Sequence, residues 1–219
     1  MNNLLTGLYA ITAPELSQNH LVNHVEAALK GGARVIQYRD KISSEVDRLK
    51  TAKNLFDLCR DYDRPLIIND DIRLCQRVGA HGVHLGRADG DITLARQLLG
   101  PAAIIGATCH ASLDFARESL QAGANYLAFG RFFDSKSKPD APAAPLSLLT
   151  QAKSQFSIPI VAIGGITLDN AQSTLAAGAS MIAVIHSLFA VTDLSDSRTI
   201  TARAQAFSKL SDILTTEDE

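Results

Sequence analysis

Residues 158–185, IPIVAIGGITLDNAQSTLAAGASMIAVI, hold two short apolar runs with a helical pattern between them. The runs IPIVAIGG and SMIAVI are rich in β-branched residues and are bounded by glycine, serine and threonine, so we predict that both are strands. The intervening TLDNAQSTLAAG begins with a threonine suited to a helix N-terminus and ends at a glycine. Successive residues of both strands are apolar, which indicates a parallel sheet covered on both faces.

The same unit recurs along the whole chain. Eight apolar runs are predicted strands, at 7–12, 33–38, 65–69, 82–85, 103–108, 126–130, 158–165 and 180–185. Helical patterns lie between them, as at 20–32, 44–62, 92–100, 112–123 and 167–178. In the last three, Thr93, Ser112 and Thr167 are predicted helix N-caps or first-turn residues. A Gly-Ala pair opens every even-numbered strand, at Gly32-Ala33, Gly79-Ala80, Gly123-Ala124 and Gly178-Ala179.

Eight such units in 219 residues average about 27 residues each, which is the scale of a closed (β/α)8 barrel. An open doubly wound sheet is the alternative, but it gives no reason for a repeat every two units. We therefore predict an α/β fold with a single (β/α)8 TIM barrel over residues 1–219. The last residues, LTTEDE, are expected to form a short acidic tail.

The composition argues against several kinds of partner. The net charge is −2 without clustered Lys and Arg, so no nucleic-acid partner is expected. Residues 174–192 lack charged side chains and are long enough for a membrane span, but Gly178 interrupts them and a strand follows, so we expect no membrane partner. The N-terminus does not resemble a signal peptide. Three cysteines without CxxC spacing favour reduced thiols in a cytoplasmic protein.

Chemistry in such barrels occurs at the carboxyl ends of the strands, where this chain carries many polar side chains. Those at the ends of the second to fifth strands are Gln37, Arg39, Lys41, Asn69, Asp70, Asp89, Thr108 and His110. Asp70 and Asp89 follow neighbouring strands, which permits two oxygen ligands for one Mg²⁺, and nearby Lys and Arg supply positive charge. The alternative is a set of salt bridges on the rim, each of little energetic value.

The last two strands predict a phosphate site. Gly164-Gly165 ends the seventh strand, and a short helix, HSLFAV, begins near His186 after the eighth. Glycine allows close approach of backbone N–H groups, and the helix directs its N-terminus at the same point. The polar stretch RFFDSKSKPD at 131–140 follows the sixth strand and becomes a candidate active-site loop.

Together these stretches resemble the thiamin-phosphate synthase family. The matching pieces occur in the family's order between about residues 7 and 194: VIQYRDK, LIINDD, GVHLGRAD, IIGATCH, FGRFFDSKSK, IPIVAIGGI and MIAVI. The resemblance implies a Mg²⁺-dependent transferase with two phosphorylated small-molecule substrates. It would join hydroxymethyl-aminopyrimidine diphosphate to hydroxyethyl-thiazole phosphate, giving thiamin phosphate and pyrophosphate. A homodimer is compatible with this picture.

The resemblance also implies roles for individual residues. The diphosphate side comprises Gln37, Arg39, Lys41, Asn69 and the loop residue Lys138, with Asp70 and Asp89 as the Mg²⁺ ligands. The thiazole-phosphate side comprises Ser135, Ser137, Gly165, Ile185 and His186. Thr108 stands where the family commonly has serine and keeps the hydroxyl, and we place it with Arg39 and Lys138 in the catalytic set. His110 is counted among the substrate contacts.

Besides Thr108, further positions depart from the family pattern, and one histidine opens an alternative. Arg131 stands where proline is usual, and His186 where serine is usual. The related thiazole tautomerases keep the fold and the thiazole-phosphate site and use a histidine for proton transfer, a role that His110 would fill. A catalytically idle phosphate-binding barrel is the third hypothesis.

Three further residues attract attention as possible site members. His81 and His84 form an HxxH pattern, but residues three apart on a strand point to opposite faces, so a hydrogen-bonded strand residue is expected at His84 rather than a zinc ligand. Cys109 lies at the active end without an evident base and is expected to be a structural thiol.

Overall fold

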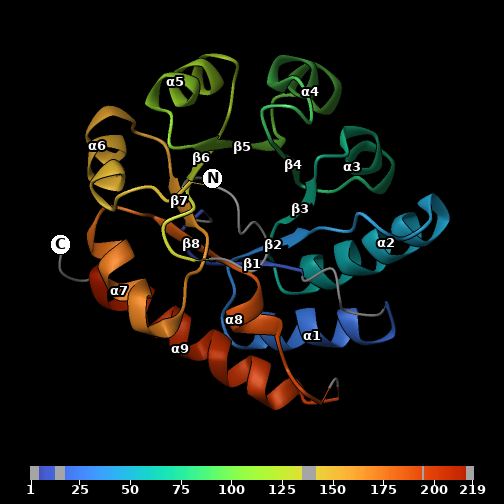
Figure 1. Ribbon diagram of the computed structural model, residues 1–219. Helices are drawn as coiled ribbons and strands as arrows, with labels where there is room; N and C mark the ends of the chain where they lie inside the picture. Colours follow the sequence, from blue (N-terminus) through green and yellow to red (C-terminus); the bar gives the residue numbers. More distant parts are fainter. Residues whose placement is uncertain (1–4, 13–17, 135–141, 194, 216–219) are drawn as a thin grey trace.

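In the computed structural model, which describes residues 5–12, 18–134, 142–193 and 195–215, eight parallel strands close into a ring (Figure 1). The strands are β1 (Gly7–Ile11), β2 (Val35–Tyr38), β3 (Leu66–Asn69), β4 (Gly82–Leu85), β5 (Ile104–His110), β6 (Tyr126–Phe129), β7 (Ile160–Ile163) and β8 (Met181–Val184). Each strand pairs with its neighbour in sequence, and β8 pairs with β1, Leu8 opposite Ile182. The predicted barrel is confirmed.

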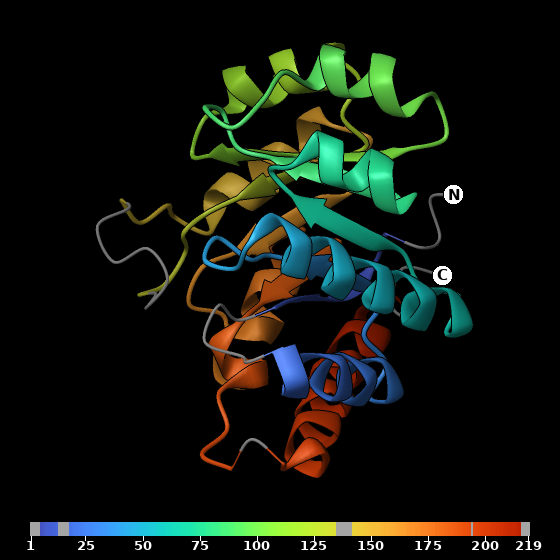
Figure 2. The same cartoon turned by 90° about the vertical axis from the view of Figure 1, so that its right-hand side faces the viewer.

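Helices cover the outside of the ring (Figure 1). Those of the described residues are α1 (Gln18–Lys30), α2 (Glu45–Asp61), α3 (Ile72–Val78), α4 (Ile92–Leu99), α5 (Leu113–Gln121), α6 (Ser147–Gln155), α7 (Leu168–Ala176), α8 (His186–Phe189) and α9 (Ser197–Thr215). Ser112 and Thr167 are N-caps as predicted, whereas Asp91 caps α4 and Thr93 lies in its first turn. Helix α9 packs beside α1, where the Thr201 hydroxyl donates to the Ala27 carbonyl over 3.2 Å (Figure 2).

The stretch at 174–192 belongs to three elements. It runs from the end of α7 through β8 and α8, so it is not one continuous helix. Within the described ranges, no helix combines the length and the apolar character that crossing a membrane requires.

The repeated Gly-Ala pairs have a common structural cause. Gly32, Gly79, Gly123 and Gly178 all adopt positive φ, between 74° and 115°. This left-handed conformation ends a helix at little cost only for glycine, and it turns the chain back toward the barrel. After α1, for example, the Ala33 N–H donates back to the Ala28 carbonyl over 3.0 Å. The two-unit repeat therefore marks the helix ends that precede the even-numbered strands.

The strands are covered on both faces, as their apolar character predicted. One set of buried side chains packs between the strands and the helices, and Leu8, Ile36 and Phe129 belong to it. A second set fills the barrel interior with Tyr9, Val35, Ile67, Tyr126, Val161 and Met181. Because strand residues alternate between faces, the interior positions continue toward the carboxyl ends with Gln37, Asn69, His84 and Thr108, which are polar.

Gly106 on β5 provides the space for Tyr126. A Cβ atom at this position would lie 2.0 Å from Tyr126 Cζ and 2.3 Å from its hydroxyl oxygen. We expect Gly106→Ala to displace the ring and lower the free energy of unfolding by about 1–3 kcal/mol, as overpacking of a core does. Urea denaturation of the wild type and the variant measures the difference.

Gly90→Ala is the matched control for this change. A Cβ at Gly90 would meet only the ends of the Leu85 and Ile72 side chains, at 3.3 Å or more, and its φ is not in the left-handed region. We expect this variant to stay within about 0.5 kcal/mol of the wild type. Equal stability of the two variants would contradict the proposed crowding at Tyr126.

Candidate active site

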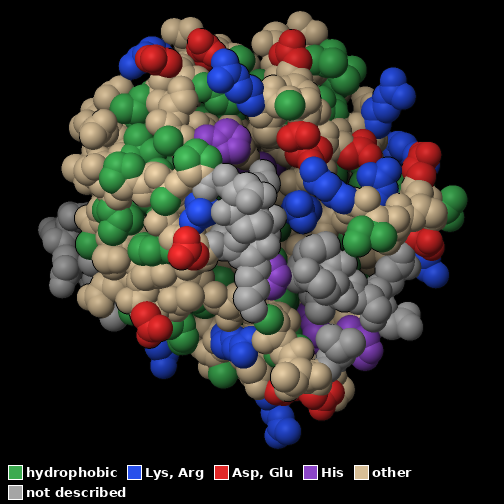
Figure 3. Space-filling model, in the orientation of Figure 1, with side chains coloured by type: hydrophobic (Ala, Val, Ile, Leu, Met, Phe, Trp, Pro, Cys, Tyr) green, Lys and Arg blue, Asp and Glu red, His purple; other side chains and the backbone are tan. Residues whose placement is uncertain are grey.

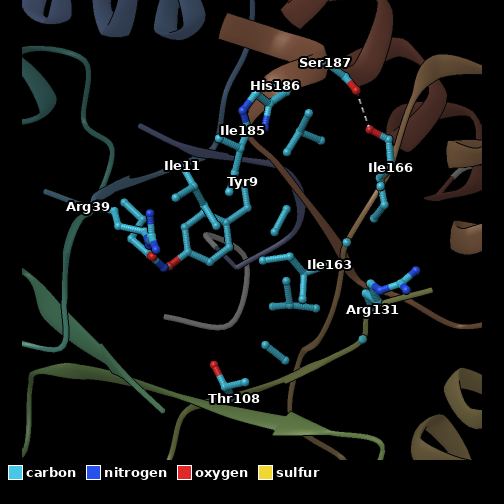
Figure 4. Close-up of a pocket in the computed structure, with 18 of the residues that line it drawn as sticks. Tyr9, Ile11, Arg39, Thr108, Arg131, Ile163, Ile166, Ile185, His186 and Ser187 are labelled. Carbon is cyan, nitrogen blue, oxygen red and sulfur yellow. Dashed lines mark hydrogen bonds between the residues drawn. The ribbon is translucent and has the colours of Figure 1, made fainter. Parts of the chain in front are cut away.

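A pocket of about 320 Å³ opens at the carboxyl ends of the strands (Figure 4). Its apolar wall includes Ile11, Ala128, Val161, Ile163 and Ala183 from four strands. Eight residues predicted from the sequence line it: Gln37, Arg39, Asn69, Thr108, His110, Gly165, Ile185 and His186. The structure therefore brings both predicted halves of the site into one cavity. Ser135, Ser137 and Lys138 lie outside the described residues.

The backbone of Arg39 is hydrogen-bonded to Thr12 at the mouth of the pocket. Its N–H donates to the Thr12 hydroxyl oxygen over 2.9 Å, and that hydroxyl donates back to the Arg39 carbonyl over 3.2 Å. Thr12 is buried at the end of β1, so this pair joins the first two loops of the barrel. Figure 4 shows the Arg39 side chain beside Tyr9, within the lining of the pocket. These bonds fix the Arg39 backbone, and its guanidinium is a positive group in the lining of the cavity.

The predicted carboxylates lie beside the pocket rather than in its lining. Asp70 has a φ of 62°, and its Oδ2 accepts from Lys41 Nζ at 3.1 Å and from Asn69 Nδ2 at 2.6 Å. Asp71 turns away, caps α3 by accepting from the Leu74 N–H, and pairs with Arg48 at 3.4 Å. Acidic and basic side chains therefore alternate on this face of the molecule (Figure 3).

The neighbouring loop brings the second carboxylate back toward β4. The Asp89 N–H donates to the Gly86 carbonyl over 3.1 Å. A Cβ at Gly86 would lie 2.2 Å from Asp89 Oδ2, so the carboxylate folds over this glycine. Two carboxylates beside an anion-binding pocket fit Mg²⁺, which commonly takes one or two protein oxygens and completes its shell with water and phosphate. No cluster of three or more His, Cys, Asp or Glu occurs in the described part of the chain.

The Gly164-Gly165 pair packs against the loop after β6 and also lines the pocket. Both glycines adopt positive φ, 102° and 67°. A Cβ at Gly165 would lie 2.3 Å from the Asp134 carbonyl oxygen, and the Gly164 carbonyl accepts from the Phe133 N–H at 3.0 Å. The sequence predicted only close approach to a ligand. The structure shows that the loop after β6 also requires these glycines.

The two loops of the predicted phosphate site are tied to each other. Helix α8 begins at His186, as expected, and the Ser187 hydroxyl donates to the Ile166 carbonyl over 2.8 Å (Figure 4). Asn170 Nδ2 donates to the Gly165 carbonyl over 3.0 Å. These bonds fix the backbone of both loops around the same end of the pocket.

Arg131 acts within its own loop and also lines the pocket. Its Nη1 donates to the Phe133 carbonyl at 3.2 Å and pairs with Asp134 Oδ1 at 2.8 Å. The side chain is only 15% exposed. Where the family usually has proline, this chain stabilises the start of the loop with an ion pair.

Sequence reasoning missed a tyrosine pair at the base of the pocket. The Tyr9 and Tyr126 hydroxyls lie 2.7 Å apart, and Gln37 Nε2 donates to Tyr9 over 2.7 Å. His84 extends this contact, with Nδ1 2.9 Å from the Tyr126 hydroxyl and Nε2 2.7 Å from Thr108 Oγ1. Strand alternation places all five residues on the inward face, a signal that becomes readable once the barrel is assumed.

The two histidines of the HxxH pattern lie in different surroundings, as expected from their spacing. His84 points into the barrel, whereas His81 Nδ1 accepts from the Leu66 N–H at 3.1 Å. His84 is thus the hydrogen-bonded strand residue that we predicted.

The known proteins can now be compared with this geometry. The sequence profile of the family described as thiamine monophosphate synthase matches residues 8–188. The chain belongs to this family. Thiamine phosphate pyrophosphorylase from Pyrococcus furiosus is 33% identical with a TM-score of 0.84, over 97% of this chain and 98% of that one. The enzyme of the same name from Bacteroides thetaiotaomicron is 15% identical with a TM-score of 0.72, over 94% and 98%, and shows the fold alone.

Membership in the thiamine monophosphate synthase family confirms the resemblance found in the sequence. It makes the chain a transferase of thiamin biosynthesis that acts on two small molecules. The reaction accordingly has to be explained by the polar and cationic groups around this pocket.

The cysteines of this family member are not positioned as nucleophiles. Cys59, Cys75 and Cys109 are free and buried, and burial raises the pKa of each thiol to about 12. At pH 8, below this pKa, almost no thiolate forms in the folded state. We expect Ellman's reagent to react with the native protein at least about tenfold more slowly than with the denatured protein. A thiol that reacts equally fast in both states would contradict this.

Proposed function

We propose that the pocket binds both substrates of thiamin-phosphate synthesis, with their phosphate groups at opposite sides. The diphosphate would lie near Arg39, Asn69 and Thr108, and the thiazole phosphate near Gly165 and His186. The observation that carries this proposal is that residues from β2, β3 and β5 and residues from β7 and β8 line one cavity. The apolar wall between them offers a surface for the two heterocycles.

The diphosphate side has the charges that a departing anion needs. Arg39 lines the pocket and Lys41 pairs with Asp70 at 3.1 Å. Asp70 and Asp89 would hold Mg²⁺, which when bound would neutralise negative charge on the diphosphate. Lys41 pairs with Asp70, which is itself a proposed Mg²⁺ ligand. The positive charge of Lys41 would therefore lie close to the phosphates that the metal binds. Lys138 is proposed as a further cation from the loop.

The chemistry requires charge stabilisation more than a base. The electron pair of the C–O bond leaves with the diphosphate, and a carbocation remains on the methylene of the pyrimidine. The thiazole nitrogen then donates its lone pair to form the C–N bond. Arg39 and the Thr108 hydroxyl are positioned to stabilise the leaving group. The walls formed by Ile11, Val161 and Ile163 would limit attack by water.

The thiazole phosphate would be held mainly by backbone. Gly164, Gly165, Ile185 and His186 line that end of the pocket. Because the backbone N–H groups of both loops remain, the thiazole-phosphate site would persist with His186 in place of the family's serine. Ser135 and Ser137 are proposed as additional contacts.

We also propose a single domain over residues 1–219, which is supported by the closure of the described strands into one barrel. The protein acts in the cytoplasm, which the three free, buried cysteines support. A homodimer remains a prediction, to be checked by sedimentation.

Asp70→Asn tests the metal side of the site. We expect kcat/KM for thiamin phosphate formation to fall roughly 100-fold, because a ligand oxygen and the charge beside Lys41 are lost. The assay mixes both precursors and varies Mg²⁺, and the wild type should lose activity when the metal is removed with EDTA. Properly folded wild type that makes no thiamin phosphate would refute the proposed reaction.

Asp71→Asn is the matched control for this variant. It changes the adjacent carboxylate, but asparagine caps a helix about as well as aspartate and keeps an oxygen that can accept from Arg48 across the half-buried contact at 3.4 Å. We expect activity within about threefold of the wild type. If both variants lose activity equally, Asp70 has no special role in metal binding.

His110 motivates the alternative of a thiazole tautomerase. It lines the pocket, and its φ of 51° directs the chain away from β5 at this point. As a proton-transfer residue it would make metal-independent aromatisation of a thiazole phosphate carboxylate sensitive to His110→Ala. We expect no such activity, and a strong His110-dependent signal would favour the tautomerase.

A further inference from the structure

Five polar side chains inside the barrel form one continuous hydrogen-bonded chain. It runs from Gln37 through Tyr9, Tyr126 and His84 to Thr108, with donor–acceptor distances between 2.7 and 2.9 Å. Gln37, Tyr9, Tyr126 and His84 are all buried and Thr108 is half-buried, and all of them except Tyr126 line the pocket. The family resemblance counts Gln37 and Thr108, at the two ends, among the substrate contacts but gives the three residues between them no role.

The hydrogen-bonded chain has a direction because the Gln37 atom at its start is an amide nitrogen, which can only donate. The Gln37 amide nitrogen gives a hydrogen to the Tyr9 oxygen, so the Tyr9 hydrogen goes to the Tyr126 oxygen. Tyr126 then donates to His84 Nδ1, which must be unprotonated. The ring hydrogen of a neutral His84 therefore lies on Nε2 and is donated to Thr108 Oγ1.

The opposite direction leaves a buried hydrogen without an acceptor. If His84 Nδ1 donated to Tyr126 and Tyr126 to Tyr9, the Tyr9 oxygen would receive two hydrogens. Its own hydrogen would then find no acceptor among these groups, at a cost of about 1–3 kcal/mol. A doubly protonated His84 has the same defect. Burial also raises the pKa of both phenols, so both tyrosines keep their hydrogens.

We infer that His84, Tyr126 and Tyr9 are positioning residues that make Thr108 a hydrogen-bond donor toward the substrate. Because the Thr108 oxygen accepts from His84, its own hydrogen is available to the pocket. This donor suits an anionic phosphate oxygen and disfavours an amino group. The inference rests on the proposed function for the identity of that substrate, here the diphosphate whose negative charge grows as the C–O bond breaks.

The direction of the chain is measurable without any substrate. Protein labelled with ¹⁵N-histidine gives ring signals that report which nitrogen carries the proton, and His84→Gln assigns one of the six histidines by loss of its signal. We expect His84 in the wild type to be neutral with its proton on Nε2. A proton on Nδ1, or on both nitrogens at neutral pH, would overturn the inference.

Gln37→Glu should reverse the direction. A carboxylate only accepts, so Tyr9 would donate to Glu, Tyr126 to Tyr9, and His84 Nδ1 would gain a proton to donate to Tyr126. The double variant Tyr9→Phe/Gln37→Glu is the matched control, because the cut chain should leave the proton on Nε2. An unchanged His84 in Gln37→Glu would contradict transmission along the chain. If Gln37→Glu fails to fold, the wild-type signal still decides, because a proton on Nδ1 of His84 would overturn the inference.

The donor role of Thr108 is tested by kinetics. Thr108→Val keeps the shape of the side chain, and we expect it to lower kcat roughly 10- to 100-fold with little change in KM, since the donor acts on charge that develops during the reaction. Thr108→Ser should restore most of the activity. An unchanged kcat in Thr108→Val would refute the donor role. A wild type without synthase activity, but with the expected His84 proton, would refute the proposed substrate and leave the hydrogen-bonded chain standing.

Discussion

The hydrogen bonds between β8 and β1 are the constraint on which the rest of the structure depends. Because these strands pair, with Leu8 opposite Ile182, the sheet has no edges and all eight carboxyl ends surround one opening. Residues 37–41 and 185–187, which are far apart in sequence, then line or border the same pocket. In an open sheet the first and last strands would lie at opposite edges, and the two proposed phosphate sites would not face each other.

Closure also gives the inner face of the barrel two different uses. Toward the amino ends of the strands, Val35, Ile67 and Met181 fill the interior with apolar side chains. Toward the carboxyl ends, polar side chains take their place, and Gln37, His84 and Thr108 each have a hydrogen-bonding partner on another strand. A buried polar group is tolerated only under that condition, so the chain from Gln37 to Thr108 is both a part of the core and a wall of the site.

Much of the fold was predictable because its signals are local. Apolar β-branched runs, helix caps such as Ser112 and the Gly-Ala pairs each act over a few residues, and all appear where the sequence placed them. The ends of the strands likewise identified eight residues that line the pocket. Tyr9 and Tyr126 were missed because a tyrosine in an apolar run looks like core. Its hydroxyl becomes informative only once its partner is known, and that partner is 117 residues away in sequence but 2.7 Å away in space.

The sequence by itself determined the class of fold, the family and the residue types available for binding phosphate and metal, since these depend on local pattern and on ordered motifs. Only the tertiary structure decided the different roles of two adjacent aspartates and of Arg131. Asp70 turns toward Lys41 while Asp71 caps a helix, and Arg131 pairs within its loop. It also decided the direction of the inner hydrogen-bonded chain. The physical reason is that orientation, burial and hydrogen-bond partnership are set by side chains from other strands, which meet only when the barrel closes.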